Sequence, residues 1–463
     1  MPAENEKTEL FERTPIPKAV MTLALPTVLS SLVMVLYHLA DTFFVGMLDD
    51  PLQNAALTLS GPVLLAFNAV NNLFGVGTSS MMSRALGMKD YDTVYRSSAF
   101  GFYGSLISGV LFSAAFTAFR GPLLQVMGTQ QSTLSATSDY LLWTVTFGAA
   151  PAILNVVLAY LVRSEGASLH ASIGTMSGCL LNILLDPVFI LPWGLNMGAA
   201  GAGLATFLSN CAACLYFFVL LFLRRGKTFV CVKPSMFGFR RAIVLGLLGV
   251  GVPASIQNLL NVTSRMVLNN FTAAYGPDAV AAMGIASTIS SVAMQIAMGG
   301  SQGIMPLIGY NYASGNIKRM KETVIFLTAI ALGFMAVATG AMFFGARWFT
   351  LLFIQNQSVV TFGAAFLRGL CLAQPFLCID FTAVGVFQSC GMGRRALLFA
   401  VLRKIVLEIP ALLLLDKLFP PYGLAYSQLV AEALLSAAAV IMLLRIFRTL
   451  EKKKSPLAGG GKV

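Results

Sequence analysis

The chain alternates between long apolar stretches and short polar segments along almost its whole length. Twelve apolar stretches can be marked between residues 18 and 447, and each exceeds the roughly 20 residues that an α-helix needs to cross a bilayer. The pattern predicts an all-α polytopic membrane protein with twelve transmembrane helices.

The first of these stretches, residues 20–48, contains three residues that a simple membrane anchor does not need. Pro26 removes a backbone donor, and His38 and Asp41 lie three residues apart on one helical face. A carboxylate at membrane depth costs about 2.5–3.5 kcal/mol on insertion scales, so it usually faces a polar interior and marks an ion or proton pathway. The alternative is a structural Asp that bonds a neighbouring helix.

The composition supports this membrane assignment. Apolar residues make up 57% of the chain and charged residues only 11%, whereas about a quarter of a soluble domain is charged. No cleavable signal is expected, because residues 1–16 carry mixed charge and the first apolar stretch is far longer than the 7–15 residues of a typical signal core. The seven cysteines fall in apolar stretches or basic loops, so neither a disulfide framework nor a metal centre is expected.

The net charge of +12 comes from loops between the apolar stretches, so we attribute it to membrane topology and expect the lipid bilayer, not nucleic acid, as the partner. Of the 31 Lys and Arg residues, 24 lie in the two terminal tails and in the loops after even-numbered stretches. By the positive-inside rule, this distribution predicts a multi-pass protein of the plasma (inner) membrane with both termini in the cytoplasm.

A basic loop at residues 224–241 divides the twelve stretches into six and six. We therefore expect an N-terminal tail (1–17), two six-helix bundles (18–223 and 242–447) and a C-terminal tail (448–463) that is disordered from Lys452 onwards. The halves resemble each other, since Pro26 is matched by Pro253, and Pro151 is matched by Pro375. Paired bundles of this kind, with a cavity between them, form transporters that alternate between two open states.

Polar residues of three stretches occur at a common predicted depth. Asp41 and Asp186 each lie about seven residues from an outer end, Thr206 lies about eight residues into its stretch, and Asn182 is one turn from Asp186. This level is roughly 10 Å below the outer surface at a rise of about 1.5 Å per residue. Two close carboxylates cannot both ionise cheaply, so they can take a proton or a cation such as Na⁺. The alternative is a hydrogen-bonded cluster that only holds helices together.

Five motifs occur in order and together resemble the multidrug and toxic compound extrusion (MATE) transporters. The resemblance spans about residues 16–447. It implies export of bulky, often cationic, amphipathic drugs or metabolites in exchange for H⁺ or Na⁺, without an organic cofactor. It also implies an ion site formed by Asp41, Asn182, Asp186 and Thr206. The motifs are Leu25-Pro26 with Tyr37–Gly46, Ser83–Gly87, Leu185–Ile190, Gly201–Thr206 and Pro306–Asn311.

Two departures from the family pattern affect the predicted coupling. One branch of the family carries an acid in its seventh helix, but residues 242–275 contain none, which favours the DinF-like branch that couples through Asp41 of the first helix. His38 stands where an Asn is common. Because His titrates near neutral pH, we expect His38 to tune the pH at which Asp41 changes its charge.

Three further acids lie within apolar stretches: Asp380, Glu408 and Glu432. Lys404 and Glu408 are four residues apart and can pair on one helix. Asp380 can either pair with Arg265 or bind a cationic substrate, and ion coupling is expected to survive loss of Glu408 or Glu432. The candidate residues of a substrate cavity are Tyr37, Asn68, Asn72, Asn155, Gln257, Asn261, Arg265, Met294 and Asp380.

Several other functions fit the sequence less well. A lipid-linked oligosaccharide flippase of the same superfamily would have two further spans and a more basic cavity, and an exporter of a non-drug metabolite remains an alternative. A major-facilitator transporter would carry an Asp-Arg-x-Gly-Arg-like loop after its second span, where this chain has Ser83–Asp90. An enzyme is not expected, because the sequence shows no nucleophile–base pair, metal-ligand cluster or phosphate loop. We expect a monomer.

Overall fold

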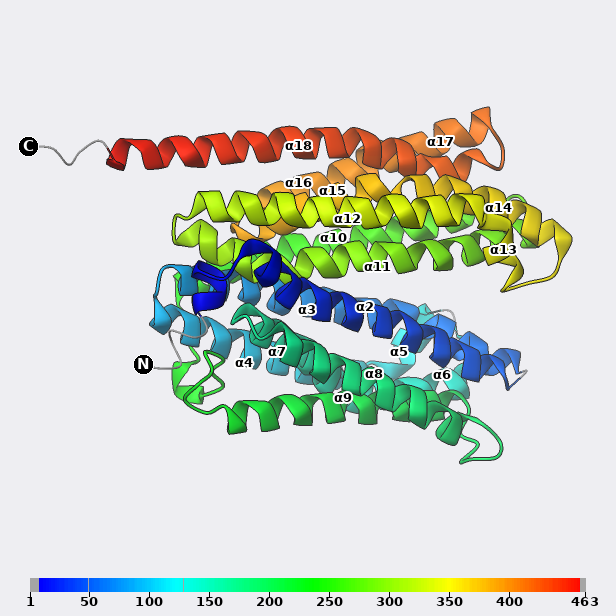
Figure 1. The fold of residues 1–463 in the computed structure, drawn as a ribbon. Helices are drawn as coiled ribbons and strands as arrows, with labels where there is room; N and C mark the ends of the chain where they lie inside the picture. The colour runs from blue at the N-terminus through cyan, green and yellow to red at the C-terminus, as the bar shows by residue number, and fades with distance from the viewer. Residues whose placement is uncertain (1–7, 49, 128, 459–463) are drawn as a thin grey trace, which may run out of the picture. The chain divides into compact units, whose positions relative to one another are not determined.

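The computed structural model describes residues 8–48, 50–127 and 129–458, and most of these residues are helical. The all-α fold class is confirmed (Figure 1). Before the linker, the helices are α2 (Ile16–Gly46), α3 (Pro51–Gly87), α4 (Tyr91–Ala118), α5 (Arg120–Val126), α6 (Leu134–Leu141), η1 (Leu142–Phe147), α7 (Ala149–Ser164), α8 (Ser168–Ile190) and α9 (Ala199–Leu223). After it they are η2 (Pro234–Met236), α10 (Arg241–Ala273), α11 (Pro277–Ala313), α12 (Ile317–Phe344), α13 (Ala346–Leu351), α14 (Gln357–Leu372), α15 (Gln374–Ser389), α16 (Gly393–Val401), η3 (Leu402–Glu408), α17 (Ile409–Leu418) and α18 (Gly423–Ala458).

Fewer helices than expected meet the criteria for a membrane span. Among the described residues, nine helices are long and apolar enough to cross a membrane, or eleven if each of two bent pairs forms one span. The first bent pair joins Leu134–Phe147 to Ala149–Ser164 at 51°, and the second joins α14 to α15 at 42°. The polytopic architecture is therefore confirmed, with nine to eleven candidate spans instead of the twelve predicted.

Pro375 explains the bend between α14 and α15. It occupies the second position of α15, lacks a backbone N–H, and leaves the carbonyl of Cys371 without its usual helical donor. The hydroxyl of Thr339 donates to this carbonyl at 3.1 Å. A side chain of α12 thus satisfies the backbone group that the proline exposes, as a polar group in an apolar environment requires.

The predicted eleventh span, residues 394–419, is the one that fails the test outright. It consists of α16, the π-helical segment η3 and α17, each shorter than a membrane span. The segment η3 places Arg403, Lys404 and Glu408 in the middle of this stretch. Charged residues interrupt the apolar run, and a π-helical turn is a feature that often occurs at functional positions.

The chain forms two compact units. Unit 1 contains Leu29–Ser255 and the described residues before Phe11, and unit 2 contains Phe11–Val28 and the residues from Ile256 onwards. The division crosses α2 two residues after Pro26, and it crosses α10 two residues after Pro253. The units thus differ from the predicted bundles, 18–223 and 242–447, because the first part of each of these helices packs with the other half of the sequence.

Within unit 1, α7 contacts α3, α4, α8 and α9 and so forms the centre of the packing. The linker before α10 is held against the same unit by side-chain hydrogen bonds. Ser98 bonds to the backbone of Cys231, Tyr103 donates its hydroxyl to the Val232 carbonyl at 2.9 Å, and Glu165 accepts from the Phe229 N–H at 2.6 Å. These contacts fix the start of α10.

Within unit 2, α11 contacts α12, α14 and α15, and α18 packs on α15 and α17. The residues before α2 are fixed here in a comparable way. The ring of Phe11 stacks on Tyr310 at 5.0 Å, the Tyr310 hydroxyl donates to Glu12 at 2.6 Å, and Arg319 Nε donates to the Phe11 carbonyl at 2.6 Å. Gly303 permits the close approach of α2, because a Cβ there would lie 2.7 Å from Ala24 Cα.

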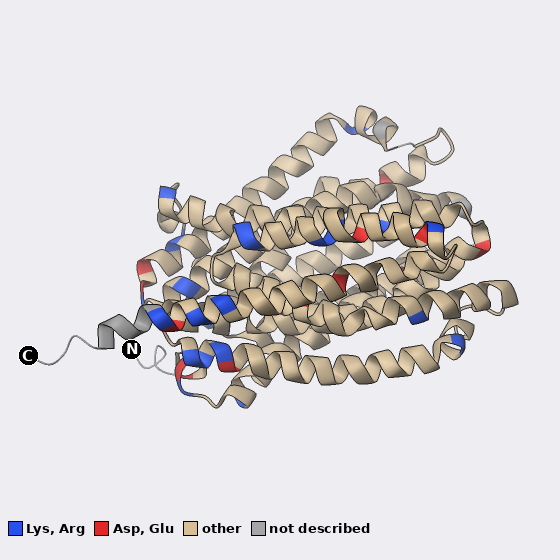
Figure 2. Cartoon of the chain, turned by 90° about the horizontal axis from the view of Figure 1, so that it is seen from above, with Lys and Arg blue, Asp and Glu red and all other residues tan. Residues whose placement is uncertain are grey.

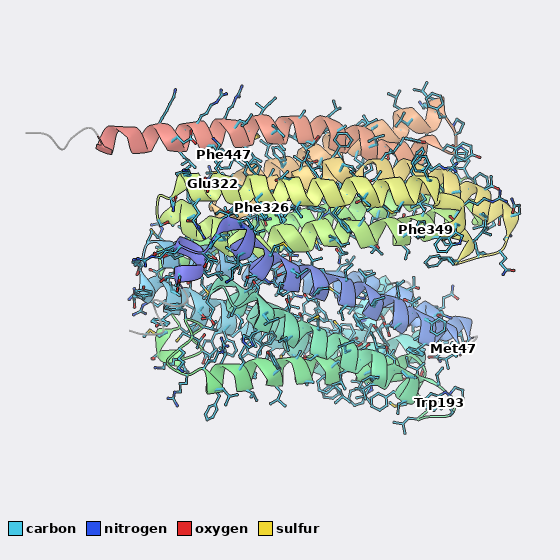
Figure 3. The ribbon with its side chains drawn as sticks, viewed as in Figure 1. Met47, Trp193, Glu322, Phe326, Phe349 and Phe447 are labelled. Carbon is cyan, nitrogen blue, oxygen red and sulfur yellow. The ribbon has the colours of Figure 1, made fainter. Side chains whose placement is uncertain are left out.

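Many charged side chains lie near the helix ends. Figure 2 shows several of the Lys and Arg residues there, including those in the last turns of α18, whereas other charged residues lie in the middle of helices. Figure 3 shows Met47 and Trp193 at one end of unit 1, where both are exposed. The prediction of disorder from Lys452 onwards is wrong as far as Ala458, where α18 ends, because Lys452–Lys454 are good helix formers that continue the helix. The rest of that tail lies outside the described residues.

Candidate functional site

The predicted ion site is located in unit 1, where α2, α8 and α9 supply its residues. Asp186 is fully buried, with 0% of its surface exposed, and Asn182 one turn earlier is 1% exposed. The Asp41 carboxylate of α2 lies close enough to Asp186 for the two charges to interact. The helical spacing on α8 turns Asn182 and Asp186 to one side, as the sequence predicts.

Asn182 links α8 to α9. In the amide orientation that satisfies both of its polar atoms, Nδ2 donates to Asp186 Oδ2 at 2.9 Å and Oδ1 accepts from the backbone N–H of Thr206 at 3.1 Å. The hydroxyl of Thr206 lies 3.4 Å from the same amide. Asn182 therefore positions one oxygen of Asp186 and holds Thr206 beside it.

One oxygen of each of the two carboxylates has no hydrogen-bond donor in the described part of the chain. Asp41 Oδ1 and Asp186 Oδ1 are buried and have no hydrogen-bond partner among the described residues. A buried acceptor without a donor costs free energy, and this cost is relieved when a proton or a cation binds. The two open oxygens, with the neighbouring amide and hydroxyl, fit the hard oxygen ligands that H⁺ or Na⁺ requires.

Two tyrosines adjoin the carboxylates. Tyr37 of α2 lies within hydrogen-bonding reach of the Thr206 hydroxyl and close to both carboxylates. Tyr140 of α6 is 4% exposed and lies near Asp41, Asp186 and Tyr37. Tyr37 was expected as a cavity residue, whereas the sequence analysis missed Tyr140, although it lies a few residues from the outer end of its stretch. The phenols can donate hydrogen bonds to carboxylates.

His38 lies apart from this cluster. Its side chain is exposed, and its ring packs on Tyr37 with ring centroids 4.7 Å apart. No ion pair or hydrogen bond joins the His38 ring to Asp41 in the described part of the chain. An effect of His38 on Asp41 would thus act through space or through Tyr37.

The other candidate cavity residues of unit 1 make contacts of their own. Asn72 donates to the Asn68 carbonyl at 2.8 Å, one turn earlier on α3. Asn155 is buried and donates to Asn210 Oδ1 at 2.6 Å, which joins α7 to α9. These contacts do not include the carboxylates.

The candidates of unit 2 are more dispersed. Gln257 accepts from Gln388 Nε2 at 3.2 Å, and Arg265 Nη2 lies 4.0 Å from Met294 Sδ. Asn261 lies on α10, between Gln257 and Arg265 in the sequence, and is half-buried. Arg265 therefore contacts a soft sulfur atom and not a carboxylate.

A buried charged cluster lies in unit 2. Arg403 Nε donates to Glu432 Oε1 at 2.6 Å, and the guanidinium also lies 5.1 Å from the Phe381 ring. Lys404 forms the predicted ion pair with Glu408, which also accepts from Ser264. Paired buried charges of this kind are strongly destabilised when one partner is removed.

Asp380 belongs to this cluster, so its suggested pairing with Arg265 is wrong. It lies beside Glu432 and near Arg403. Neither oxygen of Asp380 has a donor among the described residues, so a bond to Glu432 requires a proton on one of the two carboxyl groups. The two acids can share one proton.

Comparison with known proteins gives the family. The family model described as MatE matches residues 26–188 and again residues 253–414, so the chain contains two copies of one repeat. The multidrug export protein MepA of Staphylococcus aureus (strain MRSA252) is 32% identical over 441 residues, covering 95% of this chain and 96% of that protein. MepA of Staphylococcus haemolyticus (strain JCSC1435) is 32% identical over 460 residues, covering 98% and 99%.

Solved structures agree with this assignment at the level of the fold. A multidrug resistance MATE family transporter in an outward-facing conformation superposes with a TM-score of 0.91 at 24% identity, covering 96% of this chain and 99% of that one. A MOP superfamily transporter from Pyrococcus furiosus superposes with a TM-score of 0.89, with the same identity and coverage. Both halves of the sequence match the family model, and relatives match over nearly the full length. The chain therefore belongs to the MATE family of transporters and not to an enzyme family.

Proposed function

We propose that this transporter is a secondary active antiporter that exports amphipathic, cationic drugs or metabolites in exchange for H⁺ or Na⁺. The MepA relatives are named multidrug export proteins, which supports the drug substrate class. The observation that carries the proposal is the pair of buried, unpartnered oxygens on Asp41 and Asp186. Such a pair binds a cation in the state that buries it and releases the cation in a hydrated state.

Coupling then follows from differential affinity. A bound ion shifts the transporter toward one conformation only if it binds that conformation more tightly. Asp41 lies on α2, a helix whose two parts belong to different units, so a change of charge at Asp41 acts on a helix shared by both. In this conformation Asn182 engages Asp186 Oδ2, which leaves Oδ1 for the ion.

The absence of an acid between residues 242 and 275 supports coupling through α2, as in the DinF-like branch. Glu408 and Glu432 are occupied by Lys404 and Arg403, which argues against them as the primary ion site. The coupling ion can be H⁺ or Na⁺, because carboxylate and amide oxygens suit both.

We further propose two six-helix bundles that alternate between inward-open and outward-open states. We also propose a monomer in the plasma (inner) membrane with both termini in the cytoplasm. The loop charges support this orientation through the positive-inside rule. Labelling of single cysteines introduced in the loop 224–241 tests it. Reaction with an impermeant thiol reagent from outside intact cells would contradict the orientation.

Counterflow in proteoliposomes tests the function itself. The purified chain is reconstituted with a cationic dye inside, and a pH gradient or a Na⁺ gradient is imposed separately. Dye movement driven by one gradient and abolished by an ionophore that collapses it is the expected result. Dye movement that ignores both gradients would contradict the antiport proposal.

A further inference from the structure

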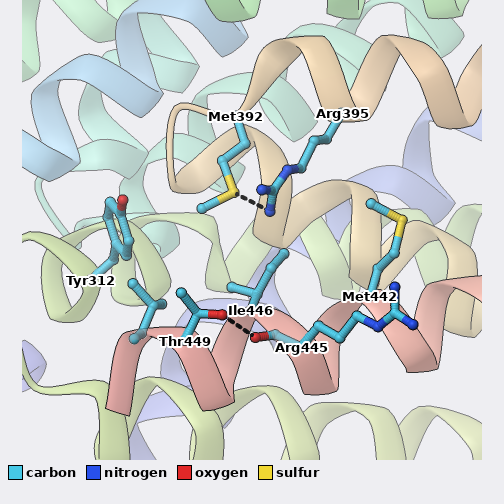
Figure 4. A pocket seen from close by; sticks show the side chains of 8 residues that line it. Tyr312, Met392, Arg395, Met442, Arg445, Ile446 and Thr449 are labelled. Carbon is cyan, nitrogen blue, oxygen red and sulfur yellow. Dashed lines mark hydrogen bonds between the residues drawn. The ribbon is translucent and has the colours of Figure 1, made fainter. Parts of the chain in front are cut away.

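A pocket of about 390 Å³ lies within unit 2, where the ends of α11 and α18 meet the start of α16 (Figure 4). It is separate from the ion site and from the buried charged cluster, since it shares no residue with either. The lining residues are Tyr312, Met392, Arg395, Met442, Arg445, Ile446, Thr449 and Leu450.

The lining carries two positive charges and no acid. Arg395 and Arg445 form no ion pair with any acid in the described part of the chain. Arg395 Nη1 lies 3.4 Å from Met392 Sδ, a weak acceptor. Glu451, the acid that follows Arg445 on α18, is paired with Lys321 at 3.3 Å. The pocket is therefore an electropositive site without an internal counter-ion.

The rest of the lining combines apolar residues of α18 with the hydroxyl groups of Tyr312 and Thr449, and the pocket lies where the apolar helix surface ends. Met442, Ile446 and Leu450 line it from α18. On the outer face of α18, Ile441 and Leu444 are 52% and 47% exposed, and the basic residues begin directly after them. Exposed apolar side chains of a membrane helix face lipid, so the two arginines lie at the level of the headgroups.

At the corresponding place in the first repeat, a histidine takes the position of the arginine and bonds to neighbouring side chains. Gly166 and Gly391, with φ values of 87° and 75°, are followed four residues later by His170 and Arg395. His170 Nε2 lies 2.6 Å from Arg224 Nη2, and its Nδ1 lies 3.2 Å from the Tyr216 hydroxyl. The second repeat has arginine at the position of His170, and this Arg395 forms no ion pair with an acid among the described residues.

We propose that this pocket binds the phosphate group of an anionic phospholipid from the leaflet on the C-terminal side. The two guanidinium groups match a phosphate, which each can bind through two parallel hydrogen bonds. Ile441 and Leu444 offer an apolar surface for the acyl chains, a feature that a soluble phosphate would not need. Basic pockets between transmembrane helices commonly bind anionic headgroups in this way.

Native mass spectrometry of the full chain in detergent measures the binding. Dioleoyl phosphatidylglycerol should bind at least about tenfold more tightly than dioleoyl phosphatidylcholine. The double variant Arg395→Gln/Arg445→Gln should lose this preference to within about twofold. The matched control Arg394→Gln/Arg448→Gln removes the same charge from exposed positions of the same helices outside the pocket, and it should keep the preference. Equal loss in both variants would overturn the proposal, because net charge alone would then explain the binding.

Two further arms separate the possible ligands and mechanisms. Glycerol 3-phosphate carries the headgroup without acyl chains, so a hundredfold excess should not displace the phospholipid. Complete displacement would overturn the lipid assignment in favour of a soluble phosphate.

Arg395→Lys/Arg445→Lys keeps the charge but loses the paired donors, so it should retain only part of the preference for phosphatidylglycerol over phosphatidylcholine. This variant also tests the proposal if the Gln variant does not fold. Full retention would contradict the proposed phosphate contacts.

Discussion

Asn182 Nδ2 donates to Asp186 Oδ2 at 2.9 Å across one turn of α8, while the second oxygen of Asp186 stays buried without a donor. One amide thus fixes a carboxylate and leaves half of it available. The same amide binds the backbone N–H of Thr206 at 3.1 Å. The relationship makes Asn182 a positioning residue whose removal should change the ion affinity of Asp186 without removing a charge.

Asn182→Ala should change the apparent affinity for the coupling ion. If the ion is H⁺, the affinity should rise, because the ionised carboxylate loses a donor; if the ion is Na⁺, the affinity should fall, because the carboxylate ligand loses its fixed position. Loss of one hydrogen bond to a charged group costs about 1.5–3 kcal/mol, which corresponds to roughly 10–150-fold. The measurement is the ion concentration that gives half-maximal drug counterflow. Ser177→Ala on the same helix is the control and should leave the affinity unchanged, because among the described residues its hydroxyl bonds only to the Gly174 carbonyl of its own helix. An unchanged ion affinity in Asn182→Ala would mean that the hydrogen bond from Asn182 to Asp186 does not affect ion binding.

Tyr140→Phe should reduce gradient-driven transport while folding is retained. The phenol lies near both carboxylates, and Phe keeps the ring but removes the donor. Tyr160→Phe is the matched control, because Tyr160 is also buried in unit 1 but packs against Arg163 at 5.4 Å instead. If the two variants transported equally well, Tyr140 would be a packing residue.

His38→Asn should move the transport–pH curve upward by roughly a few tenths of a pH unit. An imidazolium near Asp41 stabilises the ionised carboxylate, so its removal lets Asp41 keep a proton to higher pH. The shift should be small, because His38 is exposed and makes no direct bond to Asp41. The assay is efflux from everted vesicles between about pH 5.5 and 8.5. His170→Asn replaces the other histidine of the chain and should not move the curve. A curve that stays in place for His38→Asn would exclude His38 from coupling.

Arg403→Met should destabilise the protein by about 3–5 kcal/mol, because Glu432 is left as a buried charge without its partner. Lys321→Met breaks the ion pair with Glu451, whose side chains are 39% and 48% exposed, and it should cost at most about 1 kcal/mol. Denaturant unfolding in detergent compares the two variants. Similar losses in the free energy of unfolding would show that the buried Arg403–Glu432 pair stabilises the protein no more than the exposed Lys321–Glu451 pair.

Much of the fold could be predicted from the sequence because apolar length and helical spacing are local properties. The four-residue spacing of Asn182 and Asp186 predicted that both side chains lie on one face of α8. The same spacing predicted the ion pair between Lys404 and Glu408. Asp41 and Thr206, which share a predicted depth with Asp186, lie with it in unit 1. The matched positions Pro26 and Pro253 predicted the repeat that the family model finds.

Other features depend on packing between distant segments and left no local signal. Arg403 and Glu432 are 29 residues apart, so their pairing and the place of Asp380 beside them could not be read from helical spacing. The π-helical turn of η3 has no composition cue, and it removed one of the twelve predicted spans. Tyr140 was missed because the expected donors were chosen by charge and amide chemistry, not by depth alone.

Asp41→Asn shows whether Asp41 couples ion binding to conformational change. The amide keeps the shape of the side chain but cannot be ionised, so it should hold the transporter in the state that the bound ion normally stabilises. In proteoliposomes, drug movement driven by the pH gradient or the Na⁺ gradient should fall to the level of empty vesicles. Equilibrium drug binding to the purified variant should remain within about threefold of wild type. Wild-type rates of gradient-driven drug movement in Asp41→Asn would contradict the account.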